Sequence, residues 1–265
     1  MFGYTFLWHA LLGAGLSGIS LAILSPFVTL KKISYMGEAL SHIAFAGIAL
    51  ALLLGLNLNL ITLVFVLVVA LLIGLLARLY KTEESNVITI FLSVAMALGI
   101  VLVALKKDYT FDLASYLFGN VLLVSRLDLT QLGGLTLLNL LYVGLLYREL
   151  FYITYNITMA EVYGIKVKYV YFGFLILLAL NIVTTVKIAG VILVTAQLVL
   201  PSSIAFRLTC KMQRALVISI LVSLASALAG FYLSWVLNLP TGAVIVLVEF
   251  CIYIATLLSQ PKKLC

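Results

Sequence analysis

The sequence predicts an all-α, polytopic membrane protein, a bundle of eight or nine transmembrane helices. Hydrophobic residues make up 65% of the 265 positions and charged residues only 9%, and the mean hydropathy is +1.28. A helix needs about 20 mostly apolar residues to cross a bilayer, and such runs recur along the whole chain. We therefore expect a single transmembrane domain over residues 1–265, embedded in the lipid bilayer, with no soluble domain and no nucleic-acid partner.

The apolar runs set the order of the predicted spans. The first run has neither a basic segment before it nor a small-residue cleavage site, so we expect a retained span rather than a signal peptide. An eight-span count would require one later run to be re-entrant. Windows of membrane length place the spans at residues 6–30, 36–55, 59–78, 87–105, 129–147, 168–186, 188–206, 214–236 and 240–258.

Basic residues predict the orientation of the spans. Cytoplasmic loops of membrane proteins are enriched in lysine and arginine. If the Lys31-Lys32 loop is cytoplasmic, 12 of the 16 basic residues fall on that side. The N-terminus then lies outside and the C-terminus in the cytoplasm. The basic residues that remain outside are Lys106, Lys107, Arg126 and Lys187.

Two segments between the spans are too short or too polar to cross. Residues 111–124 are apolar but interrupted, and we predict a short outer-face helix followed by a turn. Residues 147–168 form the longest polar interval, which the charge pattern places in the cytoplasm. Within it, Asn156 suits the N-cap of a short helix and Gly164 suits its C-terminal exit. Such a helix would be a docking element, and an ordinary connecting loop is the alternative.

A carboxylate and an imidazole share one helix face at the start of the second span. Glu38 and His42 lie four residues apart, so their side chains are one turn apart on the same face. A carboxylate at mid-bilayer costs on the order of 2.5–3.5 kcal/mol on insertion scales, so such groups usually face a cavity, a partner or an ion. The alternatives are a Glu38 that stabilises the helix N-terminus at headgroup level and a His42 that is a hydrogen-bonded core residue.

Carboxylate oxygen and neutral imidazole nitrogen together bind divalent metals. Two ligands are too few for one ion. A homodimer with its two-fold axis along a central pathway would bring two copies of Glu38 and two of His42 together, which gives four ligands. A site without thiolates is also weak enough to release its ion, as conduction requires.

A proline lies inside the apolar run at residues 187–203. Pro201 removes a backbone donor and should kink or interrupt the helix, and Gln197, Ser202 and Ser203 place polar groups nearby. Interrupted helices often line a pathway. The alternative is a proline-kinked packing helix that its serines stabilise.

Three segments resemble one family of membrane proteins. Residues 33–42, ISYMGEALSH, are similar to the GDALSHA signature of the membrane subunits of zinc- and manganese-importing ABC transporters. Residues 116–125, YLFGNVLLVS, followed by Asp128 and Leu129, resemble that family's YLFGSILxVS..DL stretch. Residues 190–205 resemble its VGxLLVTALLxxPAAxA segment. The order and the spacing agree over most of the chain.

The resemblance implies a type II ABC importer-like permease that forms the ion pathway as a homodimer. Each subunit would contact one cytoplasmic ABC ATPase subunit, and an extracytoplasmic metal-binding protein would deliver the ion at the outer surface near residues 106–128. The family's pathway carboxylate and histidine map onto Glu38 and His42. Its coupling sequence, Asp-Pro-x-x-Ala-x-x-x-Gly, maps onto Asn156, Ala160 and Gly164.

The chain departs from the family pattern at four positions. Glu38 replaces the usual aspartate and is one methylene longer, so the charge is kept while the geometry changes. Ala46 stands where members taken to import manganese often have proline, which favours zinc over manganese or iron(II). Asn156 and Ile157 replace Asp-Pro in the coupling sequence, which keeps helix capping available and alters the local shape.

The energy source separates three functional classes. The sequence has no G-x-x-x-x-G-K-[ST] loop, so this chain is not expected to hydrolyse ATP. With a separate ATPase subunit it would be part of an ATP-driven metal importer in a prokaryotic cell membrane, with Zn²⁺ or Mn²⁺ as transported substrate. A gradient-driven secondary metal-ion transporter, in which Glu38 is protonated in each cycle, is the main alternative. A non-transporting membrane scaffold is the third.

Overall fold

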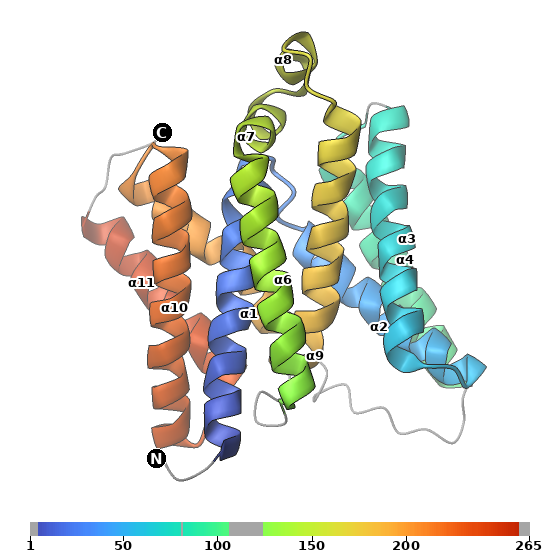
Figure 1. Ribbon diagram of the computed structural model, residues 1–265. Coiled ribbons are helices and arrows are strands. Elements are labelled where there is room, and N and C mark those ends of the chain that lie inside the picture. The colour runs from blue at the N-terminus through green and yellow to red at the C-terminus, as the bar shows by residue number, and fades with distance from the viewer. Residues whose placement is uncertain (1–4, 81, 106–123, 260–265) are drawn as a thin grey trace. The chain divides into compact units, whose positions relative to one another are not determined.

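The computed structural model describes residues 5–80, 82–105 and 124–259, and every regular element within these ranges is an α-helix (Figure 1). Seven helices are long and apolar enough to cross a membrane, and α6 with α7 adds an eighth if the two count as one span. The prediction of an all-α polytopic bundle is confirmed. The helices are α1 (Thr5–Leu30), α2 (Met36–Leu54), α3 (Leu58–Leu79), α4 (Glu84–Leu105), α6 (Arg126–Leu145), α7 (Tyr147–Tyr155), α8 (Ile157–Val162), α9 (Val167–Leu208), α10 (Met212–Leu237) and α11 (Thr241–Ser259).

Helix α9 contains two of the predicted spans, at residues 168–186 and 188–206. Its 42 residues would extend about 63 Å if straight, roughly twice the thickness of a bilayer core. Gly190 divides it, because its φ of 79° and ψ of 163° lie outside the helical region. The interruption predicted at Pro201 is thus found at Gly190, and Pro201 stays within the helix. The predicted outer-face helix at residues 111–124 lies, except for its last residue, outside the described residues.

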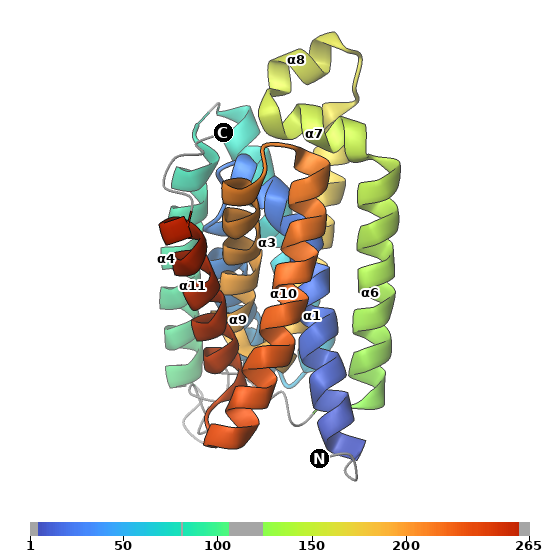
Figure 2. The same cartoon turned by 90° about the vertical axis from the view of Figure 1, so that its left-hand side faces the viewer.

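The helices form two compact units. Unit 1 contains α1, α6, α10, α11 and the part of α9 that begins at Thr184, and unit 2 contains α2, α3, α4, α8, nearly all of α7 and the part of α9 that ends at Val183. Figures 1 and 2 show α1 packed beside α6 and α10 in unit 1, and α2 packed beside α3 and α4 in unit 2. The single permease domain over residues 1–265 stays a prediction.

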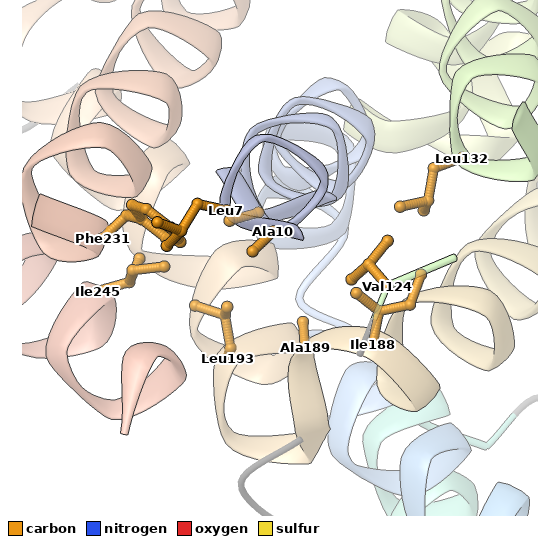
Figure 3. Packing of buried hydrophobic residues seen from close by; sticks show 10 residues of the cluster. Leu7, Ala10, Val124, Leu132, Ile188, Ala189, Leu193, Phe231 and Ile245 are labelled. Carbon is orange, nitrogen blue, oxygen red and sulfur yellow. The ribbon is translucent and has the colours of Figure 1, made fainter. Parts of the chain in front are cut away.

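Apolar side chains from several helices meet around α1 in unit 1 (Figure 3). Helix association inside a membrane depends on close packing and on hydrogen bonds rather than on the hydrophobic effect. Small residues such as Ala10 and Ala14 therefore allow neighbouring helices to approach α1. The cluster comprises Leu7, Ala10, Ala14, Val124, Leu132, Ile188, Ala189, Leu193, Phe231 and Ile245.

Polar contacts hold α6 within unit 1. The Asn139 Nδ2 donates to the Ser20 hydroxyl oxygen of α1 at 2.8 Å. At the start of α6, Ser125 and Asp128 form a capping box, and the Lys187 Nζ lies 3.1 Å from the Asp128 Oδ1. These bonds fix both the middle and the N-terminal end of α6 against its neighbours.

Helices α10 and α11 approach closely at Gly230. A Cβ atom on Gly230 would lie 2.6 Å from the Cα of Ile245 and 3.0 Å from its backbone nitrogen. Because a backbone cannot swing aside, we expect Gly230→Ala to separate the two helices and lower the free energy of unfolding by about 1–3 kcal/mol. Thermal unfolding of the purified chain in detergent measures this. Gly133→Ala, which meets no atom within 4 Å, is the matched control, and equal melting temperatures for both variants would contradict the prediction.

Candidate metal and coupling sites

Helix α2 positions Glu38 and His42 in unit 2. Glu38 lies in the first turn, and His42 lies one turn further along. From residue 36 to residue 47, every residue is buried except these two, which are half-buried. We call Glu38 and His42 the polar stripe. Within a single chain, the stripe is the one accessible strip on the first three turns of α2.

Neither side chain of the polar stripe has a hydrogen bond or an ion pair with any described residue. The Glu38 charge nevertheless acts electrostatically on the His42 imidazole. No group of three or more His, Cys, Asp or Glu residues that could hold a metal ion is found in the described ranges. One chain therefore brings together two of the predicted ligands, both available to an external partner or ion.

Close packing covers the remaining faces of α2. A Cβ atom on Gly99 of α4 would lie 2.6 Å from the Phe45 ring, and one on Gly47 would lie 3.1 Å from the Cα of Thr62 in α3. These glycines let α3 and α4 approach α2 closely. Phe45 is buried against α4 about one turn beyond His42, so buried apolar residues follow the polar stripe along α2.

The structure also fits the alternative for Glu38. A carboxylate in the first turn of a helix is stabilised by the positive end of the helix dipole, and the N-cap Tyr35 supplies no side-chain hydrogen bond of its own. The two roles are compatible, because a carboxylate near the helix start remains accessible to a ligand. The core-residue alternative for His42 is less well supported, since the imidazole is half-buried and lacks a described hydrogen-bond partner.

Helix α8 carries the predicted coupling residues. Asn156 is its N-cap, with Oδ1 accepting from the Met159 backbone N–H at 3.1 Å. At the other end, Gly164 has a φ of 74°, and the Ile165 N–H donates to the Ala160 carbonyl at 3.1 Å. This pattern is a glycine-terminated Schellman ending. The short helix, its N-cap and its glycine exit are therefore all present, and the docking role of this helix stays a prediction.

The coupling segment is anchored on one side and exposed on the other. Ala160 is fully buried, whereas Tyr155 is 83% exposed and Val162 is 77% exposed. An ion pair ties α8 to α3, since the Arg78 Nη2 lies 3.0 Å from the Glu161 Oε1. The two side chains are 41% and 52% exposed, so this pair positions α8 more than it stabilises the fold. Sequence reasoning missed the pair because its partners lie 83 residues apart.

Comparison with known proteins identifies the family. The model described as "ABC 3 transport family" matches residues 3–260. This chain belongs to the ABC 3 transport family. The manganese transport system membrane protein MntC of Listeria monocytogenes is 34% identical over 260 residues, covering 98% of this chain and 92% of that protein. The chelated iron transport system membrane protein YfeD of Yersinia pestis is 34% identical over 262 residues, covering 99% and 88%.

A solved structure agrees with the ABC 3 family assignment. PsaBC from Streptococcus pneumoniae in complex with Fab superimposes with a TM-score of 0.84 at 28% sequence identity, covering 98% of this chain and 94% of that one. The resemblance found in the sequence and the type II importer-like permease fold are thereby confirmed. The roles of the residues stay predictions, and they concern Glu38, His42, Asn156, Ala160 and Gly164.

Proposed function

We propose that this protein is the membrane-spanning subunit of an ATP-driven importer of divalent metal ions. The observation that carries the proposal is the polar stripe, a carboxylate and an imidazole left uncovered on α2 without a described partner. Ionisable side chains inside a membrane helix mark ion pathways, and this pair suits a divalent metal. The family supports a metal as the cargo, and so do relatives that are named for the transport of manganese and of chelated iron.

The working form is a homodimer in which each chain supplies half of the metal site. One described chain provides two ligands and no third His, Cys, Asp or Glu near them. A two-fold axis beside α2 would bring two polar stripes together, which gives two carboxylates and two imidazoles. The buried apolar residues beyond His42 would then limit passage in the resting state.

The ligand types favour zinc among the candidate ions, and manganese and iron(II) also fit. For a given nitrogen and oxygen site, affinity rises from Mn²⁺ through Fe²⁺, and Zn²⁺ binds more tightly than either. Ala46 favours zinc for the reason given above, while the names of the relatives favour manganese. We therefore propose that Zn²⁺ competes effectively against Mn²⁺ at the polar stripe.

Helix α8 is the proposed contact with a cytoplasmic ATPase subunit. Its exposed apolar side chains offer a docking surface, and the buried Ala160 together with the Arg78–Glu161 pair holds α8 against unit 2. Closure of the ATPase would move α8 as a small rigid element and so bias the helices to which it is attached. ATP hydrolysis takes place in that separate subunit.

The charge pattern gives the proposed orientation in a prokaryotic cell membrane. The C-terminus and the coupling segment lie in the cytoplasm. An extracytoplasmic metal-binding protein binds the outer surface near residues 106–128, of which 106–123 lie outside the described residues. Genes for an ATPase and a metal-binding protein beside the gene for this chain are expected.

Reconstitution tests the proposal. In proteoliposomes, metal uptake should require both the ATPase subunit and ATP, and it should continue when ionophores remove proton and sodium gradients. The purified chain alone should show no ATP turnover. Uptake that persists without nucleotide and collapses with the gradient would instead establish a secondary transporter.

A further inference from the structure

A second ionisable residue lies inside unit 1. Glu249 belongs to α11 and has no exposed surface. No described residue makes a well-aligned hydrogen bond to either of its carboxyl oxygens, although the Gln197 side chain lies close enough to interact with the carboxylate. Ionisable groups in a membrane interior normally pair with another group or mark an ion pathway. A contact with one neutral amide does not compensate the charge of a buried carboxylate, so helix packing alone does not explain Glu249.

Two further buried polar side chains are linked to this carboxyl group, Gln197 directly and Ser223 through Gln197. Gln197 of α9 lies beside it and is 1% exposed. Ser223 of α10 is fully buried, and its hydroxyl donates to the Gln197 Oε1 at 2.6 Å. The hydroxyl proton of Ser223 is thus already used and cannot serve Glu249. We call Gln197, Ser223 and Glu249 the oxygen cluster.

The oxygen cluster is built into the packing of α1. A Cβ atom on Gly18 would lie 2.5 Å from the Ser223 Oγ and 3.5 Å from the Gln197 Oε1. The absence of a side chain at this position therefore leaves room for the polar groups. Figure 2 shows α1, α10 and α11, three of the four contributing helices, side by side.

The cluster lies at the middle of the membrane-length helices. Glu249 is the ninth of the 19 residues of α11, and Ser223 is the twelfth of the 26 residues of α10. Gly18 is the fourteenth of the 26 residues of α1. Sites for transported ions often lie near the bilayer midplane, beside interrupted helices, and α9 is interrupted at Gly190.

The cluster is rich in oxygen acceptors. Ionised Glu249 offers two acceptor oxygens, and the hydroxyl of Ser223 and the amide of Gln197 retain unused lone pairs. The backbone carbonyl of Gln197 also lacks the N–H donor that the residue four positions later supplies in a helix, because residue 201 is proline. An uncompensated buried carboxylate costs several kcal/mol. A cation would compensate that charge and use the oxygens together.

We propose that Glu249, Gln197 and Ser223 form a second, all-oxygen cation-binding site that takes a hard divalent ion such as Mn²⁺. Carboxylate, amide and hydroxyl oxygens suit Mg²⁺, Ca²⁺ and Mn²⁺, whereas imidazole suits zinc and softer ions. A site with a single carboxylate binds weakly and releases its ion, as a transit site must. The inference rests on the proposed function only for the choice of Mn²⁺ as probe.

The test measures Mn²⁺ binding rather than transport. The full chain is purified in lipid nanodiscs, and the loss of the electron paramagnetic resonance signal of free Mn²⁺ reports binding. The background carries Glu38→Gln and His42→Ala, so that the polar stripe does not contribute. This background should still bind Mn²⁺. Adding Glu249→Gln keeps the side-chain volume and should weaken Mn²⁺ binding at least about tenfold. Roughly tenfold is the smallest loss usually seen when a residue that only supports a metal ligand is removed.

Two serines on α10 provide a matched pair. Ser223→Ala removes an oxygen of the cluster and should weaken Mn²⁺ binding. Ser219 is equally buried, but its hydroxyl bonds the Ala215 carbonyl of its own helix at 2.8 Å, so Ser219→Ala should leave binding unchanged. The proposal is overturned if the background binds no Mn²⁺, or if Glu249→Gln and Ser223→Ala both bind it as the background does. Failure of the proposed function would show separately, as metal uptake that persists without nucleotide and collapses with the ion gradient in proteoliposomes of the wild-type chain.

Discussion

His42→Ala is expected to reduce ATP-dependent metal uptake at least about tenfold in the assembled transporter. Loss of a residue that merely supports a metal ligand commonly lowers metal affinity 10–100-fold. In a homodimer both chains carry the substitution, so the proposed site would lose both imidazoles. Because His42 is half-buried and has no described hydrogen-bond partner, its truncation should leave the helix packing of unit 2 intact. Uptake of radiolabelled Zn²⁺ and Mn²⁺ into proteoliposomes measures the effect.

The chain supplies a matched control for this substitution. His9 is the only other histidine and lies on α1 in unit 1. We expect His9→Ala to transport at the wild-type rate. Both variants should elute as the wild-type complex from size exclusion and retain the ATPase subunit. Wild-type uptake by His42→Ala would remove the polar stripe from the proposed pathway.

Substitutions of Glu38 separate its charge from its helix position. Glu38→Gln keeps the length of the side chain and removes the charge, so uptake should fall as it does for His42→Ala. Glu38→Asp keeps the charge and restores the residue usual in the resembled family, so it should retain uptake. If Glu38 served only the helix dipole, Glu38→Gln would lower stability by about 0.3–1 kcal/mol and leave uptake unchanged.

Hydropathy predicted most of the fold because membrane length is a strong constraint. The third span was expected at residues 59–78, and α3 runs from Leu58 to Leu79. The boundary between the spans predicted at 168–186 and 188–206 falls close to the break in α9, but Gly190 itself lies in an apolar run and was not singled out as the interrupting residue. Pro201 was the more conspicuous residue, yet a proline can remain in a membrane helix when nearby hydroxyls and neighbouring helices satisfy the freed backbone groups.

The local parts of the candidate sites were predictable, and the long-range parts were not. A spacing of four residues places Glu38 and His42 on one face, and the capping preferences of asparagine and glycine located both ends of α8. The surroundings of Glu249 could not be inferred, because Gln197 lies on α9 and Ser223, which bonds Gln197, lies on α10. The sequence did contain a signal for Glu249 itself, an acidic residue in the middle of the span predicted at 240–258.

Gly164→Val is expected to uncouple ATP hydrolysis from metal transport. Gly164 has a φ of 74°, and a Cβ atom there would meet nothing within 4 Å. Strain of the left-handed backbone is therefore the cause of the effect, at roughly 1–2 kcal/mol. That cost would lower the population of the native α8 ending about 5- to 30-fold. The amount of metal transported per ATP hydrolysed should fall by a comparable factor, measured by parallel uptake and phosphate-release assays.

Two controls distinguish this strain from other effects of the substitution. Asparagine tolerates the left-handed region, so Gly164→Asn should couple nearly as well as the wild type. Gly55 has a φ of 66° and equally open surroundings, but it ends α2 rather than α8. Gly55→Val should therefore lower stability without changing the ratio of metal to ATP. Since both glycines carry the same type of strain, a fall in that ratio for Gly164→Val alone would assign coupling to the α8 ending. An equal fall in both variants would make it a general effect of backbone strain.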